Sequence, residues 1–241
     1  GEYSRKTIYS CCYNAKMSKI GTLNEKPLHA SLKEWYAQPE SQFEVKVDGF
    51  FIDIVQGNLL VEIQTGNFSS IKAKLKKLTQ SHRVRLVYPI AYEKWLVKFP
   101  KGGNGKNTRR KSPKRGRVED LFWEMVRIPE LLANPNFSLE VLMTQEEELR
   151  QHKENLNWRR RGWGRVERRL LAVVDQILFE EPADWLRLLP KEMGEFTSKD
   201  LSEALGISKK LSQKMAYSLR KTNVIETVGK QGRANLYEVQ R

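Results

Sequence analysis

The sequence predicts a mixed α/β domain with a mixed sheet at its core, followed by a small, mostly helical domain. Two observations lead to this prediction. Residues 17–152 alternate between stretches with the helical period and stretches with the strand period, whereas residues 166–241 contain short helical stretches and two final strands. A chain of 241 residues is also long enough for two domains that each bury a core. We expect residues 153–165 to form the linker.

The composition indicates a folded protein with an anionic partner. Hydrophobic residues make up 39% of the chain, and no apolar run approaches the roughly 18 residues that a membrane-spanning helix needs. We therefore expect an intracellular, cytoplasmic protein without a membrane partner. The 43 Lys and Arg residues against 29 Asp and Glu give a formal net charge of +14, which favours a polyanion, above all DNA. A basic protein without such a partner, or one that binds anionic lipid, is the alternative.

The two cysteines give no sign of a disulfide framework. Cys11 and Cys12 are adjacent, and the chain contains no CxxC or HxxxH spacing that would indicate zinc. Residues 1–16 show no periodicity and lack the apolar core of a secretory signal. We expect them to be a leader or an expression remnant before a natural start at Met17.

The first domain is predicted to begin with a helix over residues 22–37. Thr22 or Asn24 can cap this helix, and Pro27 falls in the first turn, where its missing N–H does no harm. The residues that recur on its apolar face are Leu28, Leu32 and Trp35.

Strands and a second helix follow. Residues 42–55 and 58–65 are rich in Val, Ile and Phe and are typical of strands. Residues 69–80 read as a helix capped by Ser69, and residues 84–91 as a buried strand. The predicted order is therefore helix, three strands, helix, strand.

A basic stretch interrupts this domain. Residues 98–117 contain glycines, prolines and many Lys and Arg residues but no acid, which predicts a mobile loop inserted in the domain. Residues 118–132 look helical and residues 137–145 strand-like, so the domain continues beyond the loop. Periodicity is lost at residues 157–165, which makes the region of residues 150–165 the best domain boundary.

The last domain has a different pattern. Residues 169–178 and 183–190 look helical. A short helix then ends at Gly206, and a tight turn leads into a second helix. The inner face of this second helix would carry Leu211, Met215 and Leu219. Two strands, residues 223–228 and 234–239, flank a turn at the end. This arrangement resembles a winged helix-turn-helix domain.

The strands at 42–65 carry acids where apolar residues would suffice. If Gly57 and Asn58 form a two-residue turn, Asp53 lies directly opposite Glu62. Two carboxylates at this separation repel each other unless a positive charge lies between them, and a divalent cation would supply it. Gln64 lies on the same face as Glu62, because the strand period is 2. An oxygen-only ligand set favours Mg²⁺ or Mn²⁺ over zinc.

Further groups could join this site, and each has an ordinary alternative. Glu25 could add a carboxylate from the preceding helix, although it also fits a capping box. Asp53 and Glu62 could instead occupy the solvated face of a half-exposed sheet. The following helix offers lysines near a bound phosphate: Lys72, Lys74 and Lys76. The three histidines, His29, His82 and His152, show no shared spacing, and we assign them no role.

With this order of elements, Glu25, Asp53 and the Glu62-Ile63-Gln64 segment resemble the PD-(D/E)XK nuclease superfamily. The resemblance covers residues 23–91 and implies a restriction-endonuclease-like core. In that family the Asp and the Glu bind Mg²⁺, and the last residue, usually Lys, positions the attacking water. Gln64 replaces that lysine here, and Lys74 or Lys72 would be the substitute.

The second domain would hold DNA. The exposed side of its second helix is expected to carry Lys209, Lys210, Gln213, Lys214, Ser218, Arg220 and Lys221, and the tip of the hairpin Lys230, Gln231 and Arg233. Gln213 is the best candidate to contact bases, because lysines mainly contact phosphates. The basic loop, with Arg109, Arg110 and Lys111, and the segment 158–163 would add phosphate contacts. The alternative is a solvated basic face.

These observations predict a Mg²⁺- or Mn²⁺-dependent DNA endonuclease. Its catalytic residues would be Glu25, Asp53, Glu62, Gln64 and Lys74, and its metal ligands Asp53, Glu62 and Glu25. Mobile-element, defence and junction-processing roles all fit, and double-strand cutting would call for a homodimer. The alternative is a non-catalytic DNA-binding protein with a degenerate nuclease fold.

Overall fold

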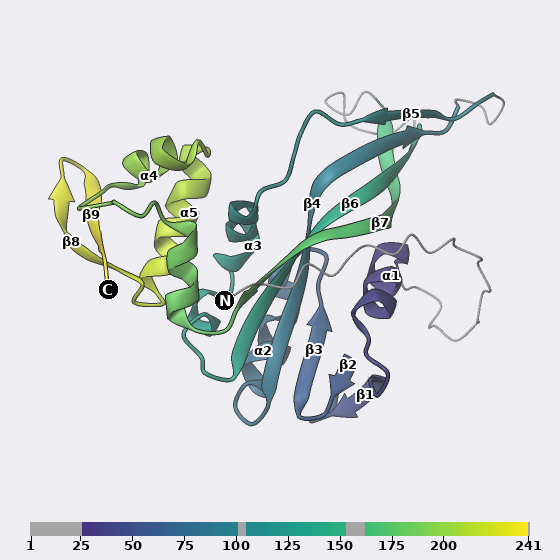
Figure 1. The fold of residues 1–241 in the computed structure, drawn as a ribbon, viewed down its shortest axis with the longest axis horizontal. Coiled ribbons are helices and arrows are strands. Elements are labelled where there is room, and N and C mark those ends of the chain that lie inside the picture. Colours follow the sequence, from purple (N-terminus) through teal and green to yellow (C-terminus); the bar gives the residue numbers. More distant parts are fainter. Residues whose placement is uncertain (1–25, 101–104, 153–161, 241) are drawn as a thin grey trace, which may run out of the picture.

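The computed structural model describes residues 26–100, 105–152 and 162–240 (Figure 1). It is a mixed α+β structure. Within the described residues, seven strands form one mixed sheet in the order β1-β2-β3-β4-β6-β7, with β5 paired to β4, and two more strands form a separate hairpin. None of the described helices is long and apolar enough to span a membrane.

The first elements follow the predicted order of helix, three strands, helix and strand. They are α1 (Pro27–Tyr36), β1 (Gln42–Val47), β2 (Phe50–Gln56), β3 (Leu59–Ile63), the 3₁₀ turn η1 (Phe68–Ile71), α2 (Lys72–Leu78) and β4 (Arg83–Lys98). β1, β2 and β3 are antiparallel neighbours, whereas β3 and β4 run parallel. A parallel pair needs a crossover, and α2 provides it.

Helix α1 begins at Pro27, after an extended Lys26, and therefore later than the helix expected over residues 22–37; Pro27 does lie in its first turn, as expected. The expected caps Thr22 and Asn24 lie outside the described residues. Leu28 and Leu32 are buried, but Trp35 is 41% exposed. The expectation that Trp35 shares their face is therefore wrong, and Tyr36 packs against this cluster instead.

The second part of the sheet consists of long strands. It contains β5 (Thr108–Lys111), η2 (Val118–Leu121), α3 (Phe122–Met125), η3 (Pro129–Leu131), β6 (Phe137–His152) and β7 (Trp163–Phe179). β6 lies parallel to β4 and antiparallel to β7. The helix expected over residues 118–132 is thus a series of three short helical turns.

The helix expected over residues 169–178 is wrong, because this segment lies within strand β7. Its pairing with β6 skips Val166, Leu171 and Val174, each at a bulge. A bulge adds one residue and resets the alternation of the side chains. Apolar residues therefore recur at spacings of three and four, which imitates the period of a helix.

The expected domain boundary moves as a consequence. Residues 163–165 of the expected linker and residues 166–179 of the expected second domain are part of the sheet. Residues 153–161 lie outside the described part of the chain, as does the expected leader at residues 1–16. The long sheet therefore ends at Phe179.

The basic stretch at residues 98–117 also contains a strand, which corrects the expectation of a loop. In β5, Thr108–Lys111 pairs with the end of β4. Arg109 lies 2.6 Å from Glu147, and Lys111 lies 2.6 Å from Glu93. The acids that hold this strand lie in β4 and β6, so the basic segment alone gave no sign of them.

After the sheet, the chain forms η5 (Pro182–Leu188), α4 (Ser198–Leu205), α5 (Lys209–Arg220), β8 (Ile225–Gln231) and β9 (Ala234–Val239). A left-handed Gly206 ends α4, and Ser208 caps α5. The predicted pair of helices followed by a hairpin is confirmed as a sequence of elements.

Two apolar clusters lie on opposite sides of the sheet. One, beneath α1, includes Leu28, Leu32 and Val61. The other lies beneath α2 and runs without a break through Phe122 and Trp185 to Met215 of α5. In Figure 1, α3 accordingly lies between the sheet and α5.

Candidate active site between β2 and β3

Asp53 in β2 and Glu62 in β3 are brought together, although not as a ladder pair. The turn forms as predicted, with Gln56 opposite Leu59 and the register ending at Ile54 opposite Val61. Beyond that point the Asp53 carboxylate reaches across and accepts a hydrogen bond from the Ile63 amide (2.8 Å). The expected direct pairing of Asp53 with Glu62 is therefore replaced by this contact.

His29 joins the site from α1, and the sequence analysis missed it. Its Nε2 lies 3.2 Å from Asp53 Oδ2. No local pattern singled out His29, because its partner Asp53 lies 24 residues further along the chain. The other two histidines lie elsewhere: His82 contacts Asp48, and His152 packs against Trp163.

Lys74 of α2 lies at the second carboxylate. Its Nζ is 2.6 Å from Glu62 Oε1 and also donates to the Phe51 carbonyl. The Glu62 side chain is only 6% exposed. The alternatives Lys72 and Lys76 both pair with Glu130, at 2.9 and 2.7 Å, so Lys74 is the lysine at the site.

The pKa values of the two carboxylates are shifted in opposite directions. Burial, with the neighbouring charge of Asp53, raises the pKa of Glu62 to about 7 despite Lys74. Burial also acts to raise the pKa of Asp53, but the contacts from His29, the Ile63 amide and Lys74 hold that pKa below its ordinary value. A pair of neighbouring carboxylates with separated pKa values is typical of functional sites.

The remaining predicted site residues differ in their placement. Gln64 donates through Nε2 to the Asn67 carbonyl (3.2 Å) and to Ser70 Oγ (3.1 Å), both at η1. Glu25, the expected third carboxylate, lies outside the described residues. Across residues 26–100, 105–152 and 162–240, no group of three or more His, Cys, Asp and Glu residues could hold a metal ion.

This site lies within the part of the chain that matches a protein family. A model of the family described as "Domain of unknown function (DUF8091)" matches residues 26–180, from α1 to the end of the sheet. The chain belongs to this family. It is 28% identical to an "Uncharacterized protein" of Treponema pallidum (strain Nichols) over 221 residues, which is 90% of this chain and 86% of the relative. No solved structure matches the chain.

The family match ends before the C-terminal elements, where most of the expected DNA contacts lie. Most of these side chains are exposed: Lys209, Lys210, Gln213, Lys221, Lys230, Gln231 and Arg233. Lys214 is half-buried, with its ammonium 5.7 Å from the centre of the Trp123 ring. The expectation for Ser218 is wrong, because its side chain is fully buried on the face of α5 that packs inward.

Proposed function

We propose that this chain is a metal-dependent DNA endonuclease with a PD-(D/E)XK-like core, in which Asp53 and Glu62 hold Mg²⁺ or Mn²⁺. The observation that carries the proposal is the meeting of two carboxylates from neighbouring strands in a mostly buried site. Glu62 Oε1 is buried and accepts no hydrogen bond of good geometry, although Lys74 lies beside it. A buried carboxylate oxygen of this kind fits a cation ligand.

Each side chain of the site would have its own role in cleavage. The metal would activate a water molecule and stabilise the charge that develops on the phosphodiester. His29 and the Ile63 amide orient Asp53 and keep it ionised. The Lys74 ammonium pairs with Glu62. When a metal ion binds Glu62 instead, this ammonium could contact a phosphate oxygen. Gln64, tied to η1, would orient water or phosphate.

The C-terminal elements support the DNA part of the proposal. The order of two helices, a tight turn between them and a final hairpin is that expected for a winged helix, and the exposed lysines of α5 would contact phosphates. The net charge of +14 favours the same partner. Mobile-element, defence and junction-processing roles are all compatible with such an enzyme.

The test is cleavage of labelled DNA in Mg²⁺, Mn²⁺ or EDTA by the wild type and by Asp53→Asn and Glu62→Gln. Both variants are expected to lose activity on the order of a hundredfold or more. The matched controls are Asp48→Asn, from the other Asp–His pair, and Glu130→Gln, from the other Glu–Lys cluster. Both controls should cut like the wild type. Cutting that persists in EDTA, or in both site variants, would contradict the proposal.

One observation favours the non-catalytic alternative. The Gln64 amide is engaged by Asn67 and Ser70, so the position that carries lysine in the nuclease family serves a local structural contact here. In that case the wild type and both site variants would bind DNA equally and cut nothing with any metal.

A further inference from the structure

A cleft rich in basic residues adjoins the candidate active site. It has a volume of about 370 Å³. Two aromatic rings, those of Tyr88 and Trp123, line it together with five cations: Lys94, Lys114, Arg150, Arg165 and Arg168. We refer to it as the basic cleft.

The sheet places the basic cleft directly beside the two carboxylates. Ile63 of β3 pairs with Val87 of β4. Beyond this pair, the chain continues from β3 through Gln64 to Thr65, and β4 continues with Tyr88. Both Thr65 and Tyr88 line the cleft. Neighbouring strands lie about 4.8 Å apart, so a strand of nucleic acid at Glu62 would reach the cleft within one or two nucleotides.

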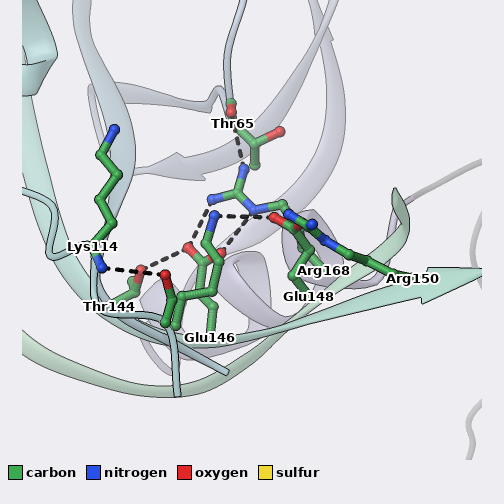
Figure 2. A network of polar contacts seen from close by, with 9 residues as sticks. Thr65, Lys114, Thr144, Glu146, Glu148, Arg150 and Arg168 are labelled. Atoms are coloured by element: carbon green, nitrogen blue, oxygen red, sulfur yellow. Dashed lines mark hydrogen bonds and ion pairs between the residues drawn. The ribbon is translucent and has the colours of Figure 1, made fainter. Parts of the chain in front are cut away.

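Two buried carboxylates hold three of the cations in place (Figure 2). Glu146, which is fully buried, accepts two hydrogen bonds from Arg168 (2.7 and 2.8 Å) and one from the Thr144 hydroxyl (2.8 Å). Glu148 accepts hydrogen bonds from Arg150 (2.6 Å) and Lys94 (3.1 Å). Fixed guanidinium groups of this kind are typical of phosphate sites.

The cleft still carries an excess of positive charge, although one acid, Asp120, also lines it. Among the described residues, no carboxylate lies within ion-pair distance of Lys114 or Arg165, and Figure 2 shows the Lys114 ammonium pointing away from the buried acids. Arg150 and Arg165 face each other across the β6–β7 ladder. Arg150 is already paired with Glu148, so of these two the charge left for an anion to neutralise, within the described residues, is that of Arg165.

The volume of the basic cleft and the ring of Trp123 indicate which kind of nucleic acid it could bind. A space of this volume accepts a small group such as one nucleotide, and it is too small for a duplex. Trp123 is 38% exposed and lies beside Lys214 of α5, so a base could stack on it. We propose that the basic cleft binds an unpaired nucleotide of a DNA strand, so that the preferred substrate is duplex DNA with a single-stranded tail or branch next to the cut.

This inference rests on the proposed function only for the cutting step, so binding is measured separately. The experiment compares the affinity of Asp53→Asn protein, in EDTA and at one salt concentration, for a blunt duplex and for the same duplex with a single-stranded tail. We expect about tenfold tighter binding of the tailed DNA, the size of one stacking contact with its phosphate. Adding Arg165→Ala together with Trp123→Ala should remove that ratio, whereas Arg83→Ala, an exposed arginine outside the cleft, should keep it.

Equal affinity for the two DNAs would overturn the inference, as would variants in the cleft that weaken both DNAs by the same factor. Circular dichroism of each variant separates loss of binding from loss of folding. A tail preference without any cleavage would support the cleft and contradict the nuclease. Cleavage without a tail preference would support the nuclease and contradict the nucleotide site in the cleft.

Discussion

At the scale of single residues, the candidate site is defined by the unequal environments of Asp53 and Glu62. Asp53 receives a hydrogen bond from the Ile63 amide and a contact from His29, both of which favour its ionised form. Glu62 has Lys74 beside it but is nearly out of reach of water. Burial therefore dominates at Glu62, and the negative charge of Asp53 adds to it.

This difference predicts how Glu62→Gln changes stability with pH. The pKa of Glu62 is raised from 4.5 to about 7 in the folded state, so between these values the unfolded chain releases the proton first. In this window wild-type stability falls as pH rises, an effect that the variant lacks. Relative to the wild type, Glu62→Gln should gain up to about 3 kcal/mol between pH 4.5 and pH 8.

The measurement is urea unfolding in EDTA at pH 5 and pH 8, with Glu130→Gln as control. The pKa of Glu130 is lowered to about 2 by Lys76 and Lys72, which outweigh its partial burial. Its stabilising effect is lost only as pH falls from the ordinary carboxyl range towards 2. The control should therefore show no relative gain at pH 8, and a pH-independent difference for Glu62→Gln would contradict the assignment.

At the scale of elements, two features of the backbone shape the sheet. Three bulges interrupt β7, which is an edge strand within the described sheet, and bulges hinder the pairing of an edge with another chain. The second feature is the segment after β5, residues 112–117, which returns along β4. There the Gly116 amide donates a hydrogen bond to the Ala91 carbonyl (3.0 Å). This close approach forms part of the wall of the basic cleft.

Gly116→Ala should therefore destabilise the protein. The added Cβ would lie 2.5 Å from the Ala91 carbonyl oxygen and 2.7 Å from Ile90 Cγ2, so the segment would have to move. We expect a loss of about 1–3 kcal/mol, the usual cost of overpacking, measured by thermal or urea unfolding. Gly194→Ala is the matched control, because its Cβ would meet nothing within 4 Å. If the Gly116 variant were as stable as the control, the segment could move without an energetic cost, and the prediction would be wrong.

At the scale of the whole molecule, the sheet and the C-terminal helices share one core. The apolar cluster beneath α2 continues through Phe122 and Trp185 to Leu211 and Met215. Arg117 Nη1 also donates to the Leu205 carbonyl at the end of α4 (2.7 Å). A core without a break couples the two parts energetically.

We therefore expect a single cooperative unfolding transition in scanning calorimetry. Met215→Ala, at a fully buried position, should lower the stability of the whole chain by about 2–5 kcal/mol and keep one transition. Val228→Ala, at an exposed position in the hairpin, should change little. Two separate transitions, with only one of them shifted by Met215→Ala, would show that the C-terminal part is an independent domain.

The sequence by itself determined the order of the first elements, the Gly57–Asn58 turn and the acids in its strands, because these depend on neighbouring residues. It misled at β7, where bulges reset the alternation. Only the tertiary structure decided that His29 meets Asp53, that Lys74 rather than Lys72 meets Glu62, and that β6 and β7 line a basic cleft. Each of these contacts joins residues from different elements, and their meeting depends on how the sheet and helices pack, which no local pattern records.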